Sequence, residues 1–402
     1  MICRTTLAIC IAISLNAAAP CSGAEPKYGP GVTDAEIKIG QTMPYSGPAS
    51  AVRVIGESES AYFRMINQQG GINGRRVTFI SLDDAYSPAK TMEQTRRLVE
   101  QDEVLAIMGS FGTPTNAAIQ KYLNANHVPQ LFIQAGASRW NDPSHFPWTI
   151  PFVDLLRSEA MVYGQYVLAT NPHARIAVLY QNDDFGRDYL AGLTKKLGGD
   201  AARMIVATAA YEATDPTIDS EIVALRASGA DTLLIAASPK FAAQAIRKIS
   251  EIGWHPTQFL AQVSASVTSV LTPAGLDKSA GVMTATSSKA VGDPQWADDP
   301  DYLAWLAFMR QYYPNGNIDN DFALVGYSNA TLFAEVLRRC GDELTREHLL
   351  SVATHLQGVH LPALLPGITV NISPSDYNPF KQMRLQRFDG QKWVLLPDMF
   401  GE

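Results

Sequence analysis

The sequence predicts an α/β protein with two lobes, each built on a parallel β-sheet that helices cover on both faces. Short apolar runs, typical of buried strands, alternate with segments of helical periodicity from Ile37 to Ala261. Strands that are apolar along their whole length are typical of parallel sheets with both faces covered. The alternation occurs once before and once after Trp148, and 402 residues are enough for two domains.

The expected elements follow from this periodicity and from Gly, Pro and capping residues at the element ends. In the first block we expect strands at Ile37–Thr42, Val77–Leu82, Val104–Met108 and Gln130–Ile133, and helices at Val54–Gln68, Pro88–Gln101 and Pro114–Asn124. In the second block we expect strands at Arg175–Tyr180, Met204–Ala207, Thr232–Ala236 and Gln258–Ala261, and helices at Leu155–Thr170, from the turn Asn182–Gly186 to Gly198, at Asp219–Ala227 and at Lys240–Ile252.

The composition changes after Val282. Helices are expected at Tyr302–Tyr313 and Phe322–Cys340, and the Asp389-Gly390 turn predicts a β-hairpin at Phe388–Leu396. A tail that is mostly helical and then strand completes the first two lobes rather than building a third domain.

One stretch, Ile107–Trp140, has the pattern of a ligand-binding crevice. Gly109 and Gly112 follow a buried strand and leave backbone that a ligand can approach. Thr113 before Pro114 predicts a helix start with Thr113 as the N-cap, and a helix N-terminus favours an anionic group. The next strand ends in the small residues 135–138. The alternative interpretation is an ordinary pair of strand-to-helix turns.

Charge and the N-terminus indicate an exported protein. The formal net charge is −7 and the pI is about 5.6, which argues against nucleic acid as a partner. Arg4, the apolar run Leu7–Leu15 and Ser22-Gly23-Ala24 predict a signal peptide, residues 1–24, that is cleaved after Ala24. Lipidation of Cys21 is the alternative, and Pro20 fits it poorly. No later segment is long and apolar enough to span a membrane, so we expect a periplasmic protein.

The residues give no support for catalysis, a metal or a cofactor. Gly326–Ala330 contains the G-x-S-x-A order of a nucleophile elbow, but it lies in an expected helix rather than after a strand. His348, His355 and His360 lack the spacing of metal ligands on a helix face. No phosphate loop or dinucleotide fingerprint is present. Once the signal peptide is removed Cys340 is alone, so no internal disulfide is expected, and a buried thiol on a helix is its simplest role.

The order of the motifs resembles the periplasmic substrate-binding proteins of branched-chain amino acid (Leu/Ile/Val-binding) ABC transporters. The motifs are I-K-I-G-Q-T-M-P-Y-S-G-P, I-N-Q-Q-G-G-I-N-G-R-R-V, D-D-A-Y-S-P, I-M-G-S-F-G-T and N-D-D-F-G-R-D-Y, at Ile37–Pro48, Ile66–Val77, Asp83–Pro88, Ile107–Thr113 and Asn182–Tyr189. The resemblance covers about residues 34–395.

The resemblance implies the type I periplasmic-binding fold, with two Rossmann-like lobes, a ligand in the cleft between them and delivery to a membrane ABC permease. The lobes would comprise residues 25–149 plus 286–365 and residues 150–285 plus 366–402. Three hinge crossovers would lie near Trp148–Pro151, near Val282–Ser287 and within Leu361–Phe380. A monomer is expected.

The resemblance also implies site residues. Thr113 matches the hydroxyl residue that binds the ligand carboxylate, Ala135 and Ala137 match residues that offer backbone groups, and Phe185 matches an aromatic residue from the second lobe. We expect the other ligand-binding residues on the neighbouring strand ends and loops: Tyr45, Phe111, Gly112, Gly136, Ser238 and Val263. Trp140 is expected to pack at the hinge rather than stack on the ligand.

Two departures from the family pattern concern the ligand. Amino-acid-binding members usually have bridged cysteines where Tyr86 and Gly112 stand here. They also have an acidic residue for the α-ammonium in the loop that reads Gln262–Ser266 here, which contains no acid. A buried ammonium without an anion is poorly compensated. The sequence therefore favours a carboxylic acid without an α-amino group, and Tyr45, Phe111 and Phe185 would suit an aromatic one.

Three alternatives stay open at this stage. Asp183 or Asp184 would pair an ammonium if the ligand is a branched-chain amino acid after all. The protein would be a periplasmic sensor if it presents its ligand to a receptor. A secreted hydrolase is a third class, for which the sequence offers no nucleophile with a base.

Overall fold

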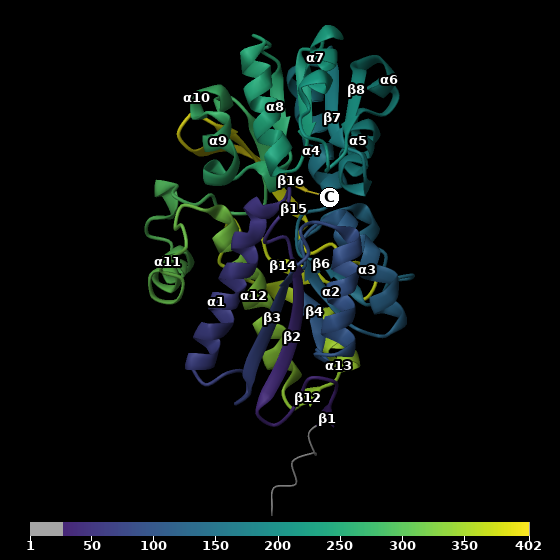
Figure 1. The fold of residues 1–402 in the computed structure, drawn as a ribbon. Helices are drawn as coiled ribbons and strands as arrows, with labels where there is room; N and C mark the ends of the chain where they lie inside the picture. The colour runs from purple at the N-terminus through teal and green to yellow at the C-terminus, as the bar shows by residue number, and fades with distance from the viewer. Residues whose placement is uncertain (1–26, 402) are drawn as a thin grey trace, which may run out of the picture.

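Two α/β lobes lie one above the other in the computed structural model, which describes residues 27–401 (Figure 1). The predicted signal peptide 1–24, with its alternative lipidation site Cys21, lies outside the described residues. The α/β class and a parallel sheet in each lobe are confirmed, and in the second sheet β15 and β16 add antiparallel pairings.

The first lobe contains a 5-stranded sheet in the order β3-β2-β4-β5-β6, and all of its pairings are parallel. Its elements are β2 (Glu36–Met43), α1 (Arg53–Gln68), β3 (Arg76–Asp83), α2 (Pro88–Glu100), β4 (Ala106–Met108), α3 (Thr113–Ala125), β5 (Gln130–Ile133) and β6 (Thr149–Pro151). Every residue of β4, β5 and β6 is buried, including the polar Gln130 and Thr149 at the starts of β5 and β6.

The second lobe contains a 7-stranded sheet in the order β16-β15-β11-β10-β9-β7-β8. Its elements before the tail are α4 (Leu156–Thr170), β7 (Ile176–Gln181), α5 (Asp184–Leu197), α6 (Ala201–Met204), β8 (Ile205–Tyr211), α7 (Asp219–Ala227), β9 (Thr232–Ala236), α8 (Pro239–Glu251), β10 (Thr257–Leu260), α9 (Thr272–Ala274), α10 (Leu276–Ser279) and β11 (Met283–Thr286). The expected strand Met204–Ala207 extends further, as β8, to Tyr211. The sequence pattern did not predict this extension. β8 is an edge strand, and the side chains of Thr208–Ala210 are small and partly exposed, so this part has no continuous apolar run.

The tail contributes to both lobes, as expected. Most of it packs into the core of the first lobe, and only its end joins the second sheet. Its elements are α11 (Pro300–Tyr312), α12 (Asp321–Cys340), β12 (Glu343–Leu344), α13 (Arg346–Ala353), β13 (Leu356–Val359), β14 (Val370–Ile372), β15 (Gln382–Phe388) and β16 (Trp393–Gly401). β12 pairs with β1 (Lys27–Tyr28), and β15 and β16 form the predicted hairpin.

The chain therefore passes between the two sheets three times: after β6, after β11 and between β14 and β15. The lobe boundaries given above stay a prediction. Within residues 27–401, no helix combines the length and the apolar character that a transmembrane span requires.

Strand order fixes where the two lobes can hold a ligand. In the first sheet β2 lies between β3 and β4, and in the second β7 lies between β8 and β9, so the direction of winding reverses beside each of these strands. Ligands of open parallel sheets bind beyond the carboxyl ends of the strands at such reversals. A ligand site is therefore expected beyond the carboxyl ends of β2 and β4 in the first lobe and of β7 and β9 in the second.

Candidate ligand-binding cleft

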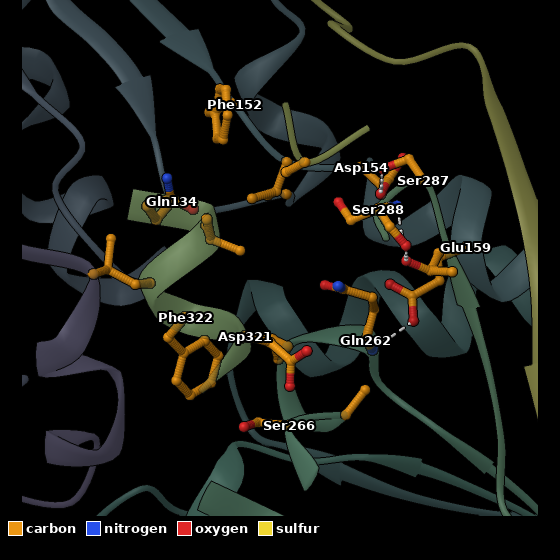
Figure 2. Close-up of a pocket in the computed structure, with 18 of the residues that line it drawn as sticks. Gln134, Phe152, Asp154, Glu159, Gln262, Ser266, Ser287, Ser288, Asp321 and Phe322 are labelled. Carbon is orange, nitrogen blue, oxygen red and sulfur yellow. Dashed lines mark hydrogen bonds between the residues drawn. The ribbon is translucent and has the colours of Figure 1, made fainter. Parts of the chain in front are cut away.

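A cavity of about 130 Å³ lies between the lobes and is lined by both of them. The first lobe contributes the segments that follow β4 and β5, and the second lobe contributes those that follow β9 and β10 and the start of α5. The cavity thus lies where the strand order predicts a ligand, beyond the carboxyl ends of the strands. Figure 2 shows side chains from several distant segments converging on this space.

Most of the predicted site residues line this one cavity: Phe111, Gly112, Thr113, Ala135, Gly136, Phe185, Ser238 and Val263. Tyr45 and Ala137 do not. The Tyr45 side chain turns onto α1, where Gly56 leaves room for it, and its hydroxyl is 2.6 Å from Oγ of Ser81. Ala137 is completely buried in the core of the second lobe. The sequence placed both at strand ends correctly but could not give the direction of their side chains.

The start of α3 differs from the prediction in a way that frees Thr113. The helix begins at Thr113 itself, and Gly112, with φ +98°, is the N-cap. Gly112 has no side chain to cap the helix, so the first amides stay available. The Thr113 hydroxyl and the Thr113 and Thr115 N–H groups have no hydrogen-bond partner among residues 27–401. These donors and the positive end of the helix form a site for an anionic oxygen.

The turn after β5 adds two more backbone donors. The N–H groups of Ala135 and Gly136 have no partner within the described chain. The Gly136 carbonyl accepts a hydrogen bond from Leu156 N at 2.8 Å. A Cβ on Gly136 would come within 2.2 Å of the Asp154 carbonyl oxygen. Only glycine allows this close approach, which fixes the donor turn against the crossover that follows β6.

The second lobe presents Phe185 and Ser238 to the cavity. Asp183 caps α5 by accepting hydrogen bonds from Phe185 N at 2.9 Å and Gly186 N at 3.3 Å, and this cap sets the position of the Phe185 ring. Ser238 N donates to the hydroxyl of Tyr211 at 2.9 Å, and that hydroxyl donates to Oε1 of Gln181 at 3.1 Å. The residues of this lobe are therefore held by capping and by a buried hydrogen-bond chain.

Contacts across the cleft surround the cavity. The Arg139 guanidinium pairs with Asp184 at 2.7 Å, and Asn320 Nδ2 donates to Oγ of Ser269 at 3.1 Å. Tyr86 lies against Gly112, because a Cβ there would come within 2.5 Å of the Tyr86 ring. Tyr86 and Gly112 are thus neighbours, as the resemblance to the cysteine-bridged proteins implied. Together these contacts describe a closed arrangement of the lobes.

Three acidic residues in the cavity lining were missed by the sequence analysis: Asp154, Glu159 and Asp321. The sequence analysis had considered only the loop Gln262–Ser266, which has no acid, and the two candidates Asp183 and Asp184. Asp154 and Glu159 are 7% and 2% exposed, and burial raises the pKa of Asp154 to about 7, that of Glu159 to about 8 and that of Asp321 to about 6. The only signal in the sequence was an acid flanked by apolar residues, as in Phe152–Leu156.

Two of these acids already have partners. Glu159 accepts hydrogen bonds from the hydroxyls of Tyr163 and Tyr189 and, at 2.8 Å, from Gln262 N. Asp321 accepts one from Val291 N at 3.0 Å. Asp183 and Asp184, the acids considered for an ammonium, are occupied by the α5 cap and by Arg139. Asp154 is different, because its Oδ1 has no partner among the described residues.

Aromatic and aliphatic side chains form most of the remaining wall. Phe111 and Phe185 line the cavity as expected, and Phe152, Phe322 and Phe380 add to them. Trp393 also lines it and donates from its indole N–H to the Ala265 carbonyl at 2.8 Å. Trp140 is buried in the core of the second lobe and is not part of the lining, and its expected packing at the hinge stays a prediction.

The motifs set aside from the sequence are explained by the structure. Ser328 lies within α12, and its hydroxyl accepts a hydrogen bond from Ala363 N at 3.1 Å, so it is not a nucleophile at a strand-to-helix turn. Cys340 is a buried free thiol on the same helix, and burial raises its pKa to about 12. Among the described residues, no group of three His, Cys, Asp or Glu side chains has the arrangement of a metal site.

The family model for periplasmic binding proteins matches residues 36–392. A Leu/Ile/Val-binding protein homolog from Brucella abortus is 23% identical over 260 residues, which cover 61% of this chain and 61% of that protein. This chain therefore spans less than two thirds of that relative's length.

Solved structures share the fold at low identity. A branched-chain amino acid ABC transporter protein from Thermus thermophilus with bound valine superposes with a TM-score of 0.82 at 16% identity, covering 92% of this chain and 98% of that one. A solute-binding protein of an ABC transporter from Rhodopseudomonas palustris, in complex with 3,4-dihydroxybenzoic acid, superposes with a TM-score of 0.75 at 19% identity, covering 91% and 97%. The resemblance inferred from the motifs is confirmed: the chain belongs to the periplasmic binding protein family.

Proposed function

We propose that this protein captures a small carboxylic acid without an α-amino group between its two lobes and delivers it to an ABC permease. It would do so in the periplasm, after cleavage of the predicted signal peptide. The observation that carries the proposal is the set of unpaired donors at the ends of β4 and β5: the Thr113 hydroxyl and the amides of Thr113, Ala135 and Gly136. Donors of this kind bind a carboxylate without a cationic side chain.

The remainder of the cavity supports an apolar body for the ligand. Phe111 and Phe185 face it from opposite lobes, and its volume of about 130 Å³ is below the roughly 300–1,000 Å³ typical of drug-sized ligands. One basic side chain lines the cavity in the described chain, Lys289, and its ammonium lies 2.8 Å from each carboxylate oxygen of Asp299. An anionic ligand would therefore depend on the neutral donors.

A second candidate, binding of a branched-chain amino acid, is favoured by one observation. The unpaired Oδ1 of Asp154 offers an anion to an α-ammonium. The other lining acids have partners. Binding an α-ammonium beside Asp154 would require both charged groups to be desolvated, which is costly. The known ligands of the structural relatives include both classes, valine in one case and a benzoic acid in the other.

Titration calorimetry on the mature protein separates the two candidates. Leucine and phenylalanine are compared with 4-methylpentanoic acid and 3-phenylpropanoic acid, which lack only the amine, and with benzoic acid. We expect at least one amine-free acid to bind more tightly than its amino acid. If leucine or phenylalanine binds tightly and its amine-free analogue does not, the proposed ligand class is wrong.

A further inference from the structure

Asp154 is an acid of the cavity lining with one carboxylate oxygen that has no hydrogen-bond partner among the described residues. It lies in the crossover between β6 and α4, and its side chain is 7% exposed. Its Oδ2 accepts a hydrogen bond from Oγ of Ser287 at 2.7 Å, whereas Oδ1 has no partner in the described part of the chain. Figure 2 shows Asp154 and Ser287 together at one side of the cavity, with the side chain of Gln262 reaching into the open space beside them.

No cationic side chain among the described residues pairs with Asp154. Lys289 is bound to Asp299, and besides burial the charge of Asp154 is one of the causes that raise the pKa of Glu159. Buried polar atoms are almost always hydrogen-bonded, and an unpaired buried acceptor is unfavourable. In a cavity built to hold a ligand, such an acceptor is satisfied when the ligand supplies a donor.

The position of Asp154 relative to the carboxylate site is fixed. Its carbonyl oxygen is in contact with Gly136, whose amide is one of the free donors, and Leu156 N is bonded to the Gly136 carbonyl at 2.8 Å. The backbone of Asp154 is therefore packed against the turn that carries the free amides, and Asp154 and Gly136 line the same cavity.

We propose that Asp154 determines specificity by accepting a hydrogen bond from a hydroxyl group of the ligand, so that the ligand is a hydroxy acid. This inference rests on the proposed function for the carboxylate end of the ligand and adds a requirement for a second polar group. A hydroxyl satisfies Oδ1 without bringing a full charge into the cavity. The carboxylate is held by Thr113 and the free amides, and the apolar body contacts the phenylalanine side chains.

The test uses ligand sets that differ at one position. Each set contains a parent acid, its hydroxy acid and its amino acid: 4-methylpentanoic acid, 2-hydroxy-4-methylpentanoic acid and leucine; 3-phenylpropanoic acid, phenyllactic acid and phenylalanine. Benzoic acid and 3- and 4-hydroxybenzoic acid form a third comparison with the hydroxyl on a ring. Dissociation constants are measured by calorimetry for the natural protein, Asp154→Ala, Asp154→Asn, Ser287→Ala and Thr113→Val.

At pH 8, where Asp154 with its pKa of about 7 is mostly ionised, we expect the natural protein to bind at least one hydroxy acid about ten- to a hundredfold more tightly than its parent, since hydrogen bonds to a charged group are the strong ones. Asp154→Ala should remove this ratio, Asp154→Asn should reduce it, and Ser287→Ala should retain it because Oδ1 is unchanged. Thr113→Val should weaken parent and hydroxy acid equally. Its failure to do so would count against the proposed function and not against Asp154.

Two results would overturn the inference. One is an Asp154→Ala variant that weakens parent and hydroxy acid by the same factor, which would indicate a purely structural role at the crossover. The other is a preference, lost in Asp154→Ala, for the amino acid over both amine-free analogues, which would assign Asp154 to an ammonium.

Discussion

The side-chain amide Nε2 of Gln181 donates a hydrogen bond to the Tyr86 hydroxyl across the cleft, over 3.3 Å. Gln181 ends β7 in the second lobe, and Tyr86 belongs to the turn between β3 and α2 in the first. Tyr86 has φ +59°, and Ala85 before it has φ +51°, a conformation that costs about 1 to 3 kcal/mol for such residues. A strained turn thus carries a residue that links the two lobes in this arrangement.

Tyr86→Phe should weaken ligand binding about two- to tenfold, because one neutral hydrogen bond of the closed state is lost. The ring, which packs on Gly112, is kept. Calorimetry measures the affinity, and thermal unfolding of the ligand-free protein should change little. Tyr122→Phe is the matched control, since the Tyr122 hydroxyl bonds Glu100 within the first lobe at 2.8 Å. Equal affinities for the natural protein and Tyr86→Phe would contradict a role in closure.

Thr113→Val should reduce ligand affinity, whereas Thr115→Val should reduce stability, although the two residues lie close together at the start of α3. The Thr113 hydroxyl is unpaired, so its loss should cost about ten- to a hundredfold in affinity and little stability. The Thr115 hydroxyl donates to the Gly112 carbonyl at 3.0 Å, so its loss should cost about 1 kcal/mol of unfolding free energy. Denaturant unfolding measures the stability of both variants, and calorimetry measures their ligand affinity. A Thr113→Val variant that loses stability but not affinity would refute the assignment of the carboxylate site.

Gly112→Ala should destabilise the protein and reduce binding together. The new Cβ would lie 2.5 Å from the Tyr86 ring and 2.7 Å from Oγ1 of Thr115, at a residue with φ +98°. We expect a loss of about 1 to 3 kcal/mol in unfolding free energy, measured with denaturant. Gly74→Ala separates the two causes, because Gly74 also has a positive φ, +78°, but has nothing within 4 Å of the added Cβ. Similar losses in both variants would show that packing against Tyr86 is unimportant.

Glu159→Gln should make stability less dependent on pH. Burial raises the pKa of Glu159 from its ordinary 4.5 to about 8, so the folded protein holds the proton more tightly than the unfolded chain does. The unfolding free energy then falls as pH rises from about 4.5 to about 8, by at most about 1.4 kcal/mol per pH unit for one group. Asp154, with a pKa of about 7, contributes in the same direction.

The measurement is denaturant unfolding of the ligand-free protein between pH 5 and 8. The slope against pH should be smaller in Glu159→Gln than in the natural protein, and smaller again when Asp154→Asn is added. A Glu159→Gln curve that runs parallel to that of the natural protein would mean that Glu159 keeps an ordinary pKa in the folded state.

Local sequence was enough to predict that helices begin close to Thr113 and Phe185. A glycine, a hydroxyl residue and a proline after a buried strand specify a helix N-terminus within a few residues, and Asp183 specifies the next one. The start of α3 was misplaced by one residue, because Gly112 and not Thr113 proved to be the N-cap.

Features that depend on distant segments could not be predicted. Tyr45 was expected in the cleft, but its direction depends on the missing side chain of Gly56 on α1. Asp154 was overlooked because its burial and its bond to Ser287 join residues 133 positions apart in the sequence. In both cases the deciding partner comes from another element, which periodicity and turn residues do not reveal.

The path of the chain has a consequence for how the molecule is made. The core of the first lobe needs α12, and the second sheet is extended beyond β11 by β15, so neither lobe is a continuous piece of the chain. A nascent chain that has just completed β11 therefore has two unfinished lobes with exposed apolar surface. Their assembly waits for contacts between residues far apart in sequence, which form slowly. No single cut would yield two independently folding fragments, and a C-terminal truncation before Gln382 would leave β11 as an unprotected edge strand, prone to pairing with other chains.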